Sequence, residues 1–286
     1  MSEVTLKELY PVPENFKQTA HINSREQYDK MWKESIEDPD GFWSKIAEEY
    51  ITWFEKWDKV MDCNYGTSAS DLYVKWFTNA KLNVSYNCLD RHLETRGDQV
   101  AILWEGNEPT EDKKFTYKEL HTEVCKFANV LKANGVKKGD VVTFYLPMIP
   151  ELAIGVLACT RIGAIHSVVF GGFSAEALRD RVNDCDSKVI VSCDGTFRGA
   201  KAIPQKANSD KCLKETPQVS LHLIVERVGD KIKCDWNDGI DKWYHEEMAK
   251  VDANCEPEHM DAEDPLFSLY TSGSTGKPKG VMHTTG

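Results

Sequence analysis

A short stretch near the carboxyl end of the sequence combines glycine, hydroxyl and lysine side chains in a pattern suited to binding phosphate. Three glycines, four serine or threonine hydroxyls and two lysines fall within residues 270–281. Because glycine has no Cβ, its backbone N–H can approach an oxyanion closely, while hydroxyls donate hydrogen bonds and lysine supplies positive charge. We therefore predict a polyphosphate site. Its candidate residues are Thr271, Ser272, Gly273, Ser274, Thr275, Gly276, Lys277, Lys279 and Gly280.

The spacing of these residues differs from that of the P-loop, which has the form G-x-x-x-x-G-K-[ST] and leads into a helix. Here two residues separate Gly273 from Gly276, and Pro278 follows directly after a lysine. The flanking segments 266–270 and 281–283 are apolar and typical of strands, so we predict a hairpin connection. A solvated glycine- and serine-rich linker is the alternative, but such a linker requires no buried strands beside it.

Composition limits the class of protein that carries this segment. The sequence has 286 residues, of which 41% are hydrophobic and 28% charged, as in globular proteins with a sizeable core. It has 35 basic and 46 acidic residues, a net charge of −11. This balance argues against binding to nucleic acid or to an anionic membrane, because both need a positive surface. An anionic ligand must therefore be held by a few local basic groups and N–H donors.

Cysteine usage and the first residues favour a cytosolic location. The nine cysteines are odd in number and scattered, and no C-x-x-C pair occurs, so we expect reduced thiols rather than disulfides or a metal site. The carboxylates Asp184, Asp186 and Asp194 are interpreted as loop and capping residues, since they lack the ligand pattern of a hard cation. No signal peptide or membrane span is expected, and a nuclear pool is left open.

The elements that must position the phosphate segment differ between the two parts of the chain. Residues 1–85 are rich in aromatic residues and helical in pattern. Ser24 opens one predicted helix with a capping box, and residues 38–41 are predicted to form a turn. The aromatic side chains could bind a planar ligand, but packing is the more common role of such a set.

Residues 86–286 alternate between helical and strand patterns. A capping box at Thr116 opens a helix with Gly135 after its end, Pro150 starts another that stops at Gly163, and a third opens near Ser174. Apolar runs at 141–146, 165–170, 188–193, 221–225 and 266–271 are predicted strands. Strands separated by helices in this way indicate an α/β fold with a mostly parallel sheet flanked by helices. Ligands of such sheets bind beyond the carboxyl ends of the strands.

The segment TSGSTGKPKG at 271–280 resembles the phosphate-loop signature of the adenylate-forming superfamily. This superfamily includes acyl-CoA synthetases, luciferases and the adenylation domains of peptide synthetases. Residues 83–90, 145–151 and 161–174 resemble the acetyl-CoA synthetase branch, as do Asp38-Pro39 and Phe42-Trp43. The resemblance implies a helical N-terminal region of that branch at 1–85. It also implies the first part of an AMP-binding domain at 86–286, cut off after the phosphate loop.

The resemblance also implies a reaction. Family members use ATP to activate a carboxylate as an acyl-adenylate, release pyrophosphate and then let CoA displace AMP. The phosphate loop would hold the β- and γ-phosphates of ATP together with Mg²⁺, with Lys279 in a supporting catalytic role, and stabilising charge on the leaving group is catalytic. Acetate, ATP and CoA are the implied small-molecule partners. The principal catalytic lysine and the acyl pocket of the family would follow residue 286, so we expect this chain alone to be inactive.

A CoA site follows from the same resemblance. Acetyl-CoA synthetases bind the 3′-phosphate of CoA with a basic pair, which Arg198 and Lys201 match here. A lysine offers a point charge rather than a bidentate fork, so Arg198 is the stronger candidate. Without the resemblance, the sequence favours an interpretation of both residues as ordinary solvated charges. The implied CoA-binding residues are Arg198, Gly199, Ala200, Lys201, Phe170, Gly171 and Gly172.

Three functions remain open from the sequence. The first is part of an AMP-forming acetate–CoA ligase, which the branch-like segments favour. The second is a propionyl- or acetoacetyl-CoA synthetase, because acyl selectivity resides in a pocket that this chain does not include. The third is a truncated, non-catalytic chain that binds CoA or a partner.

Overall fold

The computed structural model describes residues 11–271, 276 and 278–286. Contacts within the chain divide it into two units, residues 1–51 and 52–286. Each unit is described by itself below. The proposed domain boundary near residue 85 stays a prediction.

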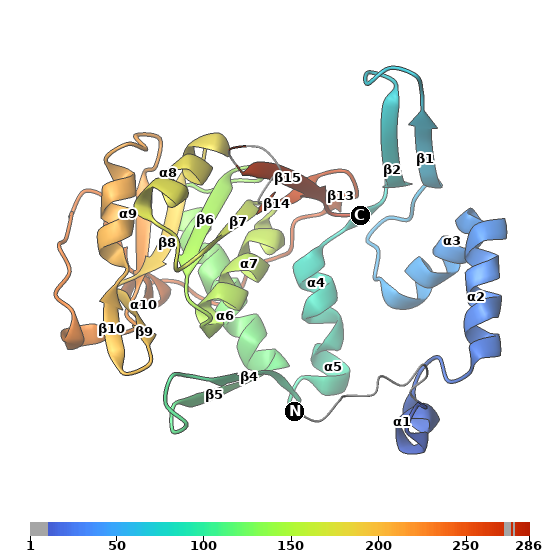
Figure 1. The fold of residues 1–286 in the computed structure, drawn as a ribbon, viewed down its shortest axis with the longest axis horizontal. Helices are drawn as coiled ribbons and strands as arrows, with labels where there is room; N and C mark the ends of the chain where they lie inside the picture. Colours follow the sequence, from blue (N-terminus) through green and yellow to red (C-terminus); the bar gives the residue numbers. More distant parts are fainter. Residues whose placement is uncertain (1–10, 272–275, 277) are drawn as a thin grey trace, which may run out of the picture. The chain divides into compact units, whose positions relative to one another are not determined.

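The described part of the first unit is helical, as expected (Figure 1). The hydroxyl of Ser24 accepts a hydrogen bond from the Gln27 N–H at the start of the second helix. The turn predicted at residues 38–41 is wrong, because Pro39 begins the third helix and the Asp38 carboxylate accepts a hydrogen bond from the Gly41 N–H. Proline suits the first position of a helix, where its missing N–H costs nothing. The helices are α1 (Glu14–Thr19), α2 (Arg25–Glu37) and α3 (Pro39–Tyr50).

The second unit opens with a feature that the helical prediction for residues 1–85 missed. Strands β1 (Lys59–Tyr65) and β2 (Leu72–Thr78) form an antiparallel hairpin. Aromatic and β-branched residues favour strands as well as cores, so their abundance in this region was compatible with a hairpin. The rings of Trp53, Trp57 and Phe77 lie with their centroids 5.0 Å apart in each pair.

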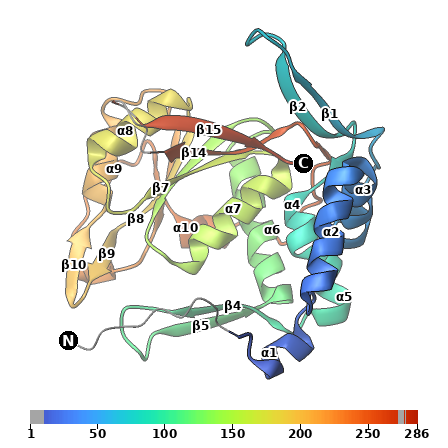
Figure 2. The ribbon, with the colours of Figure 1, turned by 45° about the vertical axis from the view of Figure 1, so that its right-hand side comes forward.

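A seven-stranded sheet forms the centre of the second unit, in the order β12-β11-β8-β6-β7-β14-β15. All neighbouring pairs are parallel except β14 with β15. The mostly parallel α/β sheet predicted from the sequence is therefore confirmed (Figures 1 and 2). The strands are β6 (Val141–Leu146), β7 (Ile165–Phe170), β8 (Val189–Cys193), β11 (Leu221–Val225), β12 (Asp241–Trp243), β14 (Pro265–Thr271) and β15 (Lys279–Thr284).

Helices cover both faces of the sheet at its inner strands, because successive residues of these strands are buried on opposite faces. In β6, Phe144 belongs to the cluster on one face and Tyr145 to the cluster on the other. The predicted capping box at Thr116 is present. Gly163 has φ +70° and ends the helix that begins at Pro150, as predicted. The first face carries α6 (Tyr117–Ala133), α7 (Pro150–Ile162) and α10 (Tyr244–Met248), and the second carries α8 (Ala175–Asp184) and α9 (Lys206–Leu213).

Shorter elements surround the sheet. Three further antiparallel pairs are present, β3 with β13, β4 with β5, and β9 with β10. Their bounds are β3 (Lys81–Leu82), β13 (Met260–Asp261), β4 (Val100–Glu105), β5 (Asp112–Thr116), β9 (Gly195–Arg198) and β10 (Lys201–Pro204). The remaining helices are α4 (Val84–Cys88), η1 (Asp90–His92), α5 (Leu93–Arg96) and η2 (Gly229–Lys231).

A half-buried ion cluster joins η1 to α6 and α7. The guanidinium of Arg161 donates to both carboxylate oxygens of Asp90 at 2.8 and 2.9 Å, and His121 Nε2 lies 3.2 Å from the same carboxylate. Burial alone would raise the pKa of Asp90, but the bonds from His121 and Arg161 hold it well below its usual value. The hydrogen bond with Asp90 and the nearby sulfur of Cys125 raise the pKa of His121 to about 9. His121 is therefore positively charged at neutral pH.

Candidate functional site

The predicted phosphate segment connects two paired strands, as expected. Strands β14 and β15 are antiparallel, and their last paired residues are Thr271 and Lys279. Gly276 has φ +78°, a left-handed conformation that favours glycine. The other predicted phosphate-binding residues between these strands lie outside the described residues. They are Ser272, Gly273, Ser274, Thr275 and Lys277.

Sheet topology determines where this connection emerges. Strand β14 runs parallel to β7, with Phe267 opposite His166 and Ser268 opposite Ser167. Thr271 therefore leaves β14 at the same edge of the sheet at which Phe170 leaves β7. That edge, formed by the carboxyl ends of the parallel strands, is where α/β sheets bind their ligands.

Tyr270, the residue before Thr271, is fixed to helix α8. Its hydroxyl donates a 2.8 Å hydrogen bond to the carboxylate of Asp184, and it lies 3.4 Å from the backbone oxygen of Arg181. Burial, together with the neighbouring Asp184 carboxylate, raises the pKa of Tyr270 well above its usual value. The hydroxyl therefore stays protonated and acts as a hydrogen-bond donor at the start of the predicted phosphate segment. Figure 2 shows α8 beside the β14–β15 hairpin.

The segment after β7 has little room for side chains. A Cβ on Gly171 would lie 2.9 Å from the backbone oxygen of Leu146, and one on Gly172 would lie 2.7 Å from the ring of Phe170. The same Gly172 position is 3.4 Å from Nη2 of Arg198. The structure therefore brings Arg198 beside the 170–172 segment, although Arg198 follows Gly172 by 26 positions in the sequence. The ring of Phe170 is 65% exposed, so it offers a surface to a ligand.

Arg198 and Lys201 face each other across a hairpin that sequence reasoning did not predict. They are the paired residues that close β9 and β10, and Gly199 and Ala200 form the two-residue turn between them. Gly199 has φ +54°, as such tight turns require. Like charges directly opposite each other on a ribbon destabilise it. No ion pair involves either side chain within the described ranges, so the pair is available to an anionic group.

Asp194 holds this hairpin in place. Its buried carboxylate accepts hydrogen bonds from the backbone N–H groups of Gly195, Arg227, Val228 and Gly229, at 2.7 to 3.2 Å. A carboxylate is suited to this role because it accepts several hydrogen bonds at once. The start of β9 is thereby tied to the segment after β11.

A second contact set supports the same hairpin from the side. Arg227 pairs with the carboxylate of Glu111, and its guanidinium lies 4.9 Å from the ring of Phe197. The side chain of Asn107 donates to the backbone oxygen of Gly199 at 2.9 Å. The loop between β4 and β5 therefore braces the turn between the two basic residues.

The carboxylates that the sequence analysis assigned to loops and caps do not gather at one place. Asp184 accepts from Tyr270, Asp186 pairs with Lys188 at 2.7 Å, and Asp194 accepts backbone hydrogen bonds. Each therefore has a structural partner of its own.

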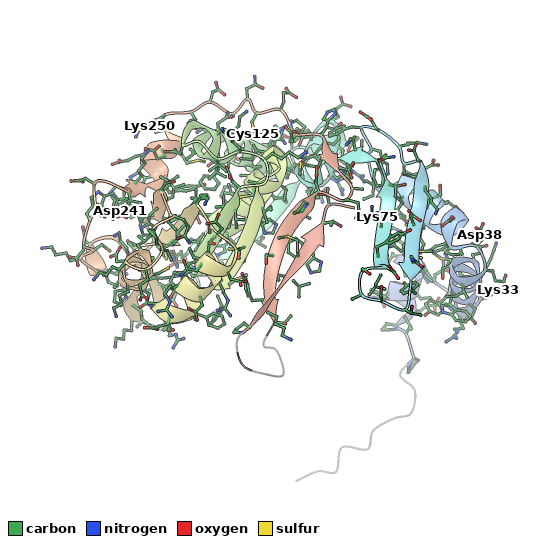
Figure 3. All side chains as sticks on the ribbon, turned by 90° about the horizontal axis from the view of Figure 1, so that it is seen from above. Lys33, Asp38, Lys75, Cys125, Asp241 and Lys250 are labelled. Carbon is green, nitrogen blue, oxygen red and sulfur yellow. The ribbon has the colours of Figure 1, made fainter. Side chains whose placement is uncertain are left out.

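A different cluster has the geometry of a cation site. Ligand atoms of Asp210, His222 and Asp241 lie within 4.8 Å of one another, and Asp241 is labelled in Figure 3. The ammonium group of Lys206 lies 2.7 Å from both carboxylates and supplies the positive charge itself. Burial alone would raise the pKa of Asp241, but hydrogen bonds from His222 and Lys206 lower it to about 2. His222 also hydrogen-bonds Ser192 at 2.7 Å, and the network is buried except for the partly exposed Asp210. We interpret it as a structural network that anchors β12.

Comparison of the sequence with known protein families identifies the class to which this chain belongs. A family described as "AMP-binding enzyme" matches residues 89–286, well over half of the chain. The chain therefore belongs to the AMP-binding enzyme family. A second family, described as "Acetyl-coenzyme A synthetase N-terminus", matches residues 28–88.

Individual relatives narrow the likeness to one branch. The chain is 55% identical to an acetyl-coenzyme A synthetase of Halorhodospira halophila, over 97% of this chain and 42% of that protein. It is 56% identical to an acetyl-coenzyme A synthetase of Magnetococcus marinus, over 100% of this chain and 43% of that protein. The resemblance to the acetyl-CoA synthetase branch is thereby confirmed. The chain spans about two fifths of the length of these curated relatives.

A solved structure has the same fold. The acetoacetyl-CoA synthetase from Streptomyces lividans matches with a TM-score of 0.79 and 27% sequence identity, over 88% of this chain and 37% of that chain. None of the helices in the described part of the chain has the length and hydropathy needed to cross a bilayer.

Proposed function

We propose that the chain is part of an AMP-forming acetate–CoA ligase. Such an enzyme converts ATP, acetate and CoA into acetyl-CoA, AMP and pyrophosphate through an acetyl-adenylate. The observation that carries the proposal is the convergence of two candidate anion sites on one edge of the sheet. Thr271 and Phe170 end parallel strands at that edge, and Arg198 lies beside Gly172. The identity of 55–56% to acetyl-coenzyme A synthetases supports the choice of reaction.

The segment between β14 and β15 would hold the β- and γ-phosphates of ATP. Main-chain N–H groups and hydroxyls of residues 271–276 would donate hydrogen bonds to the phosphate oxygens, and Lys279 would add positive charge. These groups stabilise the charge that develops on pyrophosphate as it leaves, which accelerates adenylation. Tyr270 contributes indirectly, since its bond to Asp184 fixes the strand from which the segment emerges.

The hairpin of β9 and β10 would hold the 3′-phosphate of CoA. Arg198 and Lys201 present two positive charges side by side with no ion-pair partner among the described residues, which is the arrangement that a phosphate dianion favours. The close contacts around Gly171 and Gly172 leave a surface without side chains, on which a planar base can lie against the exposed ring of Phe170.

Mg²⁺ and the location of the protein complete the proposal. Mg²⁺ binds mainly through substrate phosphates and water, so the bound polyphosphate would supply most of its ligands. When bound, the ion neutralises phosphate charge. We propose a cytoplasmic location, whereas the bacterial relatives lend no support to a nuclear pool. We retain the division into an N-terminal region at 1–85 and an AMP-binding domain at 86–286 as part of this proposal.

Two other functions remain candidates with specific support. A propionyl- or acetoacetyl-CoA synthetase would use the same two sites, and a solved acetoacetyl-CoA synthetase shares the fold. Its lower identity of 27% favours acetate. A non-catalytic chain that binds CoA would need only the Arg198 hairpin.

Acyl-dependent exchange of labelled pyrophosphate into ATP tests the proposal. The assay uses the longest natural form of the protein, with acetate, propionate or acetoacetate. We expect exchange with acetate, and Lys279→Ala should reduce it at least tenfold. Lys250→Ala is the matched control, because Lys250 is an exposed lysine that pairs with Glu247 and lies away from the β14–β15 hairpin (Figure 3). Preference for another acid would select the second candidate, and CoA binding without any exchange would select the third.

A further inference from the structure

The tip of the basic hairpin, residues 197–202, is held by individual contacts rather than by close packing. Strands β9 and β10 have four residues each, and a ribbon of two short strands is only marginally stable by itself. Asp194 fixes the other end of the hairpin, where β9 begins. A hollow of about 390 Å³ adjoins the tip, and its lining includes Asn107, Glu111, Phe197, Ala200, Arg227 and Lys231.

Two of the contacts that hold the tip depend on one carboxylate, that of Glu111. The Asn107 side chain donates to the backbone oxygen of Gly199 at 2.9 Å, and the backbone N–H of Asn107 donates to Glu111 at 3.1 Å. The guanidinium of Arg227 lies 4.9 Å from the ring of Phe197 and donates to both oxygens of Glu111. Glu111, which lies between β4 and β5, therefore supports both the turn and β9 (Figure 1).

The chain around Glu111 is shaped for these contacts. The Gly106 N–H donates to the backbone oxygen of Glu111 at 2.6 Å, and a Cβ on residue 106 would overlap Oε2 of Glu111. Hydrogen bonds from Arg227 and from the Asn107 N–H lower the pKa of Glu111, so the carboxylate is ionised at neutral pH. An ionised carboxylate can accept all three of these N–H groups, whereas an amide oxygen with an NH₂ beside it cannot.

The charge of Glu111 by itself would oppose CoA binding. A carboxylate near Arg198 and Lys201 repels a phosphate dianion, and it also neutralises Arg227. If Glu111 acted only through its charge, neutralising it would strengthen CoA binding. A loss of CoA affinity after this change therefore distinguishes a positioning role from an electrostatic one.

We propose that Glu111 is a positioning residue that sets the preference for CoA over 3′-dephospho-CoA by holding the tip that carries Arg198. Because the tip is already fixed, its basic side chains need less ordering when the 3′-phosphate binds. Glu111 itself contacts no ligand and acts through the hairpin. The inference rests on the proposed function, because it requires CoA to bind at this hairpin.

Calorimetric titration with CoA and with 3′-dephospho-CoA, in the longest natural form of the protein, tests the proposal. Glu111→Gln should weaken CoA binding about three- to tenfold and change 3′-dephospho-CoA binding less than about twofold, as expected when a site must be ordered by its ligand. The loss should be smaller than in Arg198→Ala, because Lys231 still lies 4.6 Å from the ring of Phe197. Asp112→Asn is the matched control, since it removes the same charge at the next, exposed residue and should not weaken CoA binding.

Two further variants test whether Glu111 acts through the hairpin. In an Arg198→Ala background, Glu111→Gln should change the CoA affinity less than about twofold, because the main group that it positions is absent. Arg227→Met removes the guanidinium but keeps the backbone N–H that donates to Asp194. It should reproduce the selective loss of CoA affinity.

The possible results are distinct. A selective loss for CoA in Glu111→Gln, absent in Asp112→Asn and in the Arg198→Ala background, supports the proposal. Unchanged or stronger CoA binding in Glu111→Gln overturns it, and so does an equal loss for both ligands or in both backgrounds. If Glu111→Gln does not fold, an unchanged preference for CoA in Arg227→Met also overturns it. A wild type that binds CoA no better than 3′-dephospho-CoA contradicts the proposed CoA site itself.

Discussion

Arg198→Ala, in the hairpin of β9 and β10, should weaken CoA binding without lowering the stability of the protein. The change removes one of two like charges that face each other at the end of β9 and β10. Because opposed like charges destabilise a ribbon, the variant should unfold at the same temperature as the wild type or slightly higher. The turn itself depends on Gly199, with its φ of +54°, and on the hydrogen bond from Asn107, which the substitution leaves in place.

The size of the binding effect follows from the kind of contact. A hydrogen bond to a charged group contributes about 1.5–3 kcal/mol. Loss of the Arg198 contact should therefore weaken CoA binding about 10- to 150-fold, at about 1.4 kcal/mol for each factor of ten. Lys201→Ala should have a smaller effect, about fivefold, because an exposed ammonium acts as a single point charge worth up to about 1 kcal/mol.

Calorimetry with CoA and with 3′-dephospho-CoA tests this reasoning. The wild type should prefer CoA, and Arg198→Ala should lose most of that preference while binding 3′-dephospho-CoA as well as the wild type does. Arg96→Ala, at the end of α5, removes an exposed arginine elsewhere and should change neither affinity. Unchanged CoA binding in Arg198→Ala, or an equal loss for both ligands, would refute the assignment of the 3′-phosphate to this hairpin.

Three further predictions concern stability and the shape of the site. The pKa of His121 is raised from 6.5 to about 9, so its stabilising contact with Asp90 is complete below pH 6.5 and is lost as the pH rises toward 9. A pKa difference of one corresponds to about 1.36 kcal/mol, and this contribution is reduced because the His121 side chain is 22% exposed. Urea denaturation should therefore show that the free energy of unfolding falls by about 2 kcal/mol across this pH range. The fall should be absent in His121→Gln. Asp194→Asn should lower the free energy of unfolding by about 3 kcal/mol, because an amide cannot accept all the N–H groups that the carboxylate does. A midpoint in urea equal to that of the wild type would contradict this. Gly171→Ala should lower the free energy of unfolding by about 2 kcal/mol in thermal unfolding, because its Cβ would lie 2.9 Å from the backbone oxygen of Leu146. The same substitution should weaken CoA binding. Unchanged CoA affinity would argue against the 170–172 segment as part of the CoA site.

The central sheet could be predicted because its signals are local. The capping box at Thr116, the proline at 150 and the left-handed glycine at 163 each mark a helix end, and the strands between them are continuous apolar runs. The hairpin at 59–78 could not be predicted in the same way. Its aromatic residues fit a helix face or a strand equally well, and only the antiparallel pairing of its two strands with each other decides between them. At Asp38, a sequence typical of turns is also typical of a helix start.

The candidate site was predictable only in part. The phosphate segment and the basic pair depend on short stretches of sequence, so resemblance was enough to select them. The groups that hold them are far apart in the chain. Arg227 and Glu111 are separated by 116 positions, and Asp194 receives N–H groups from residues 33 to 35 positions away. Nothing in the local sequence marks Tyr270 and Asp184 as partners, because their contact depends on α8 packing against the sheet.

A crystal structure with MgATP tests the central claim most directly. We expect density for the β- and γ-phosphates within hydrogen-bonding distance of main-chain N–H groups between Thr271 and Lys279, at the carboxyl end of β14. Nucleotide bound at another place, with no phosphate near this segment, would contradict the proposed phosphate site.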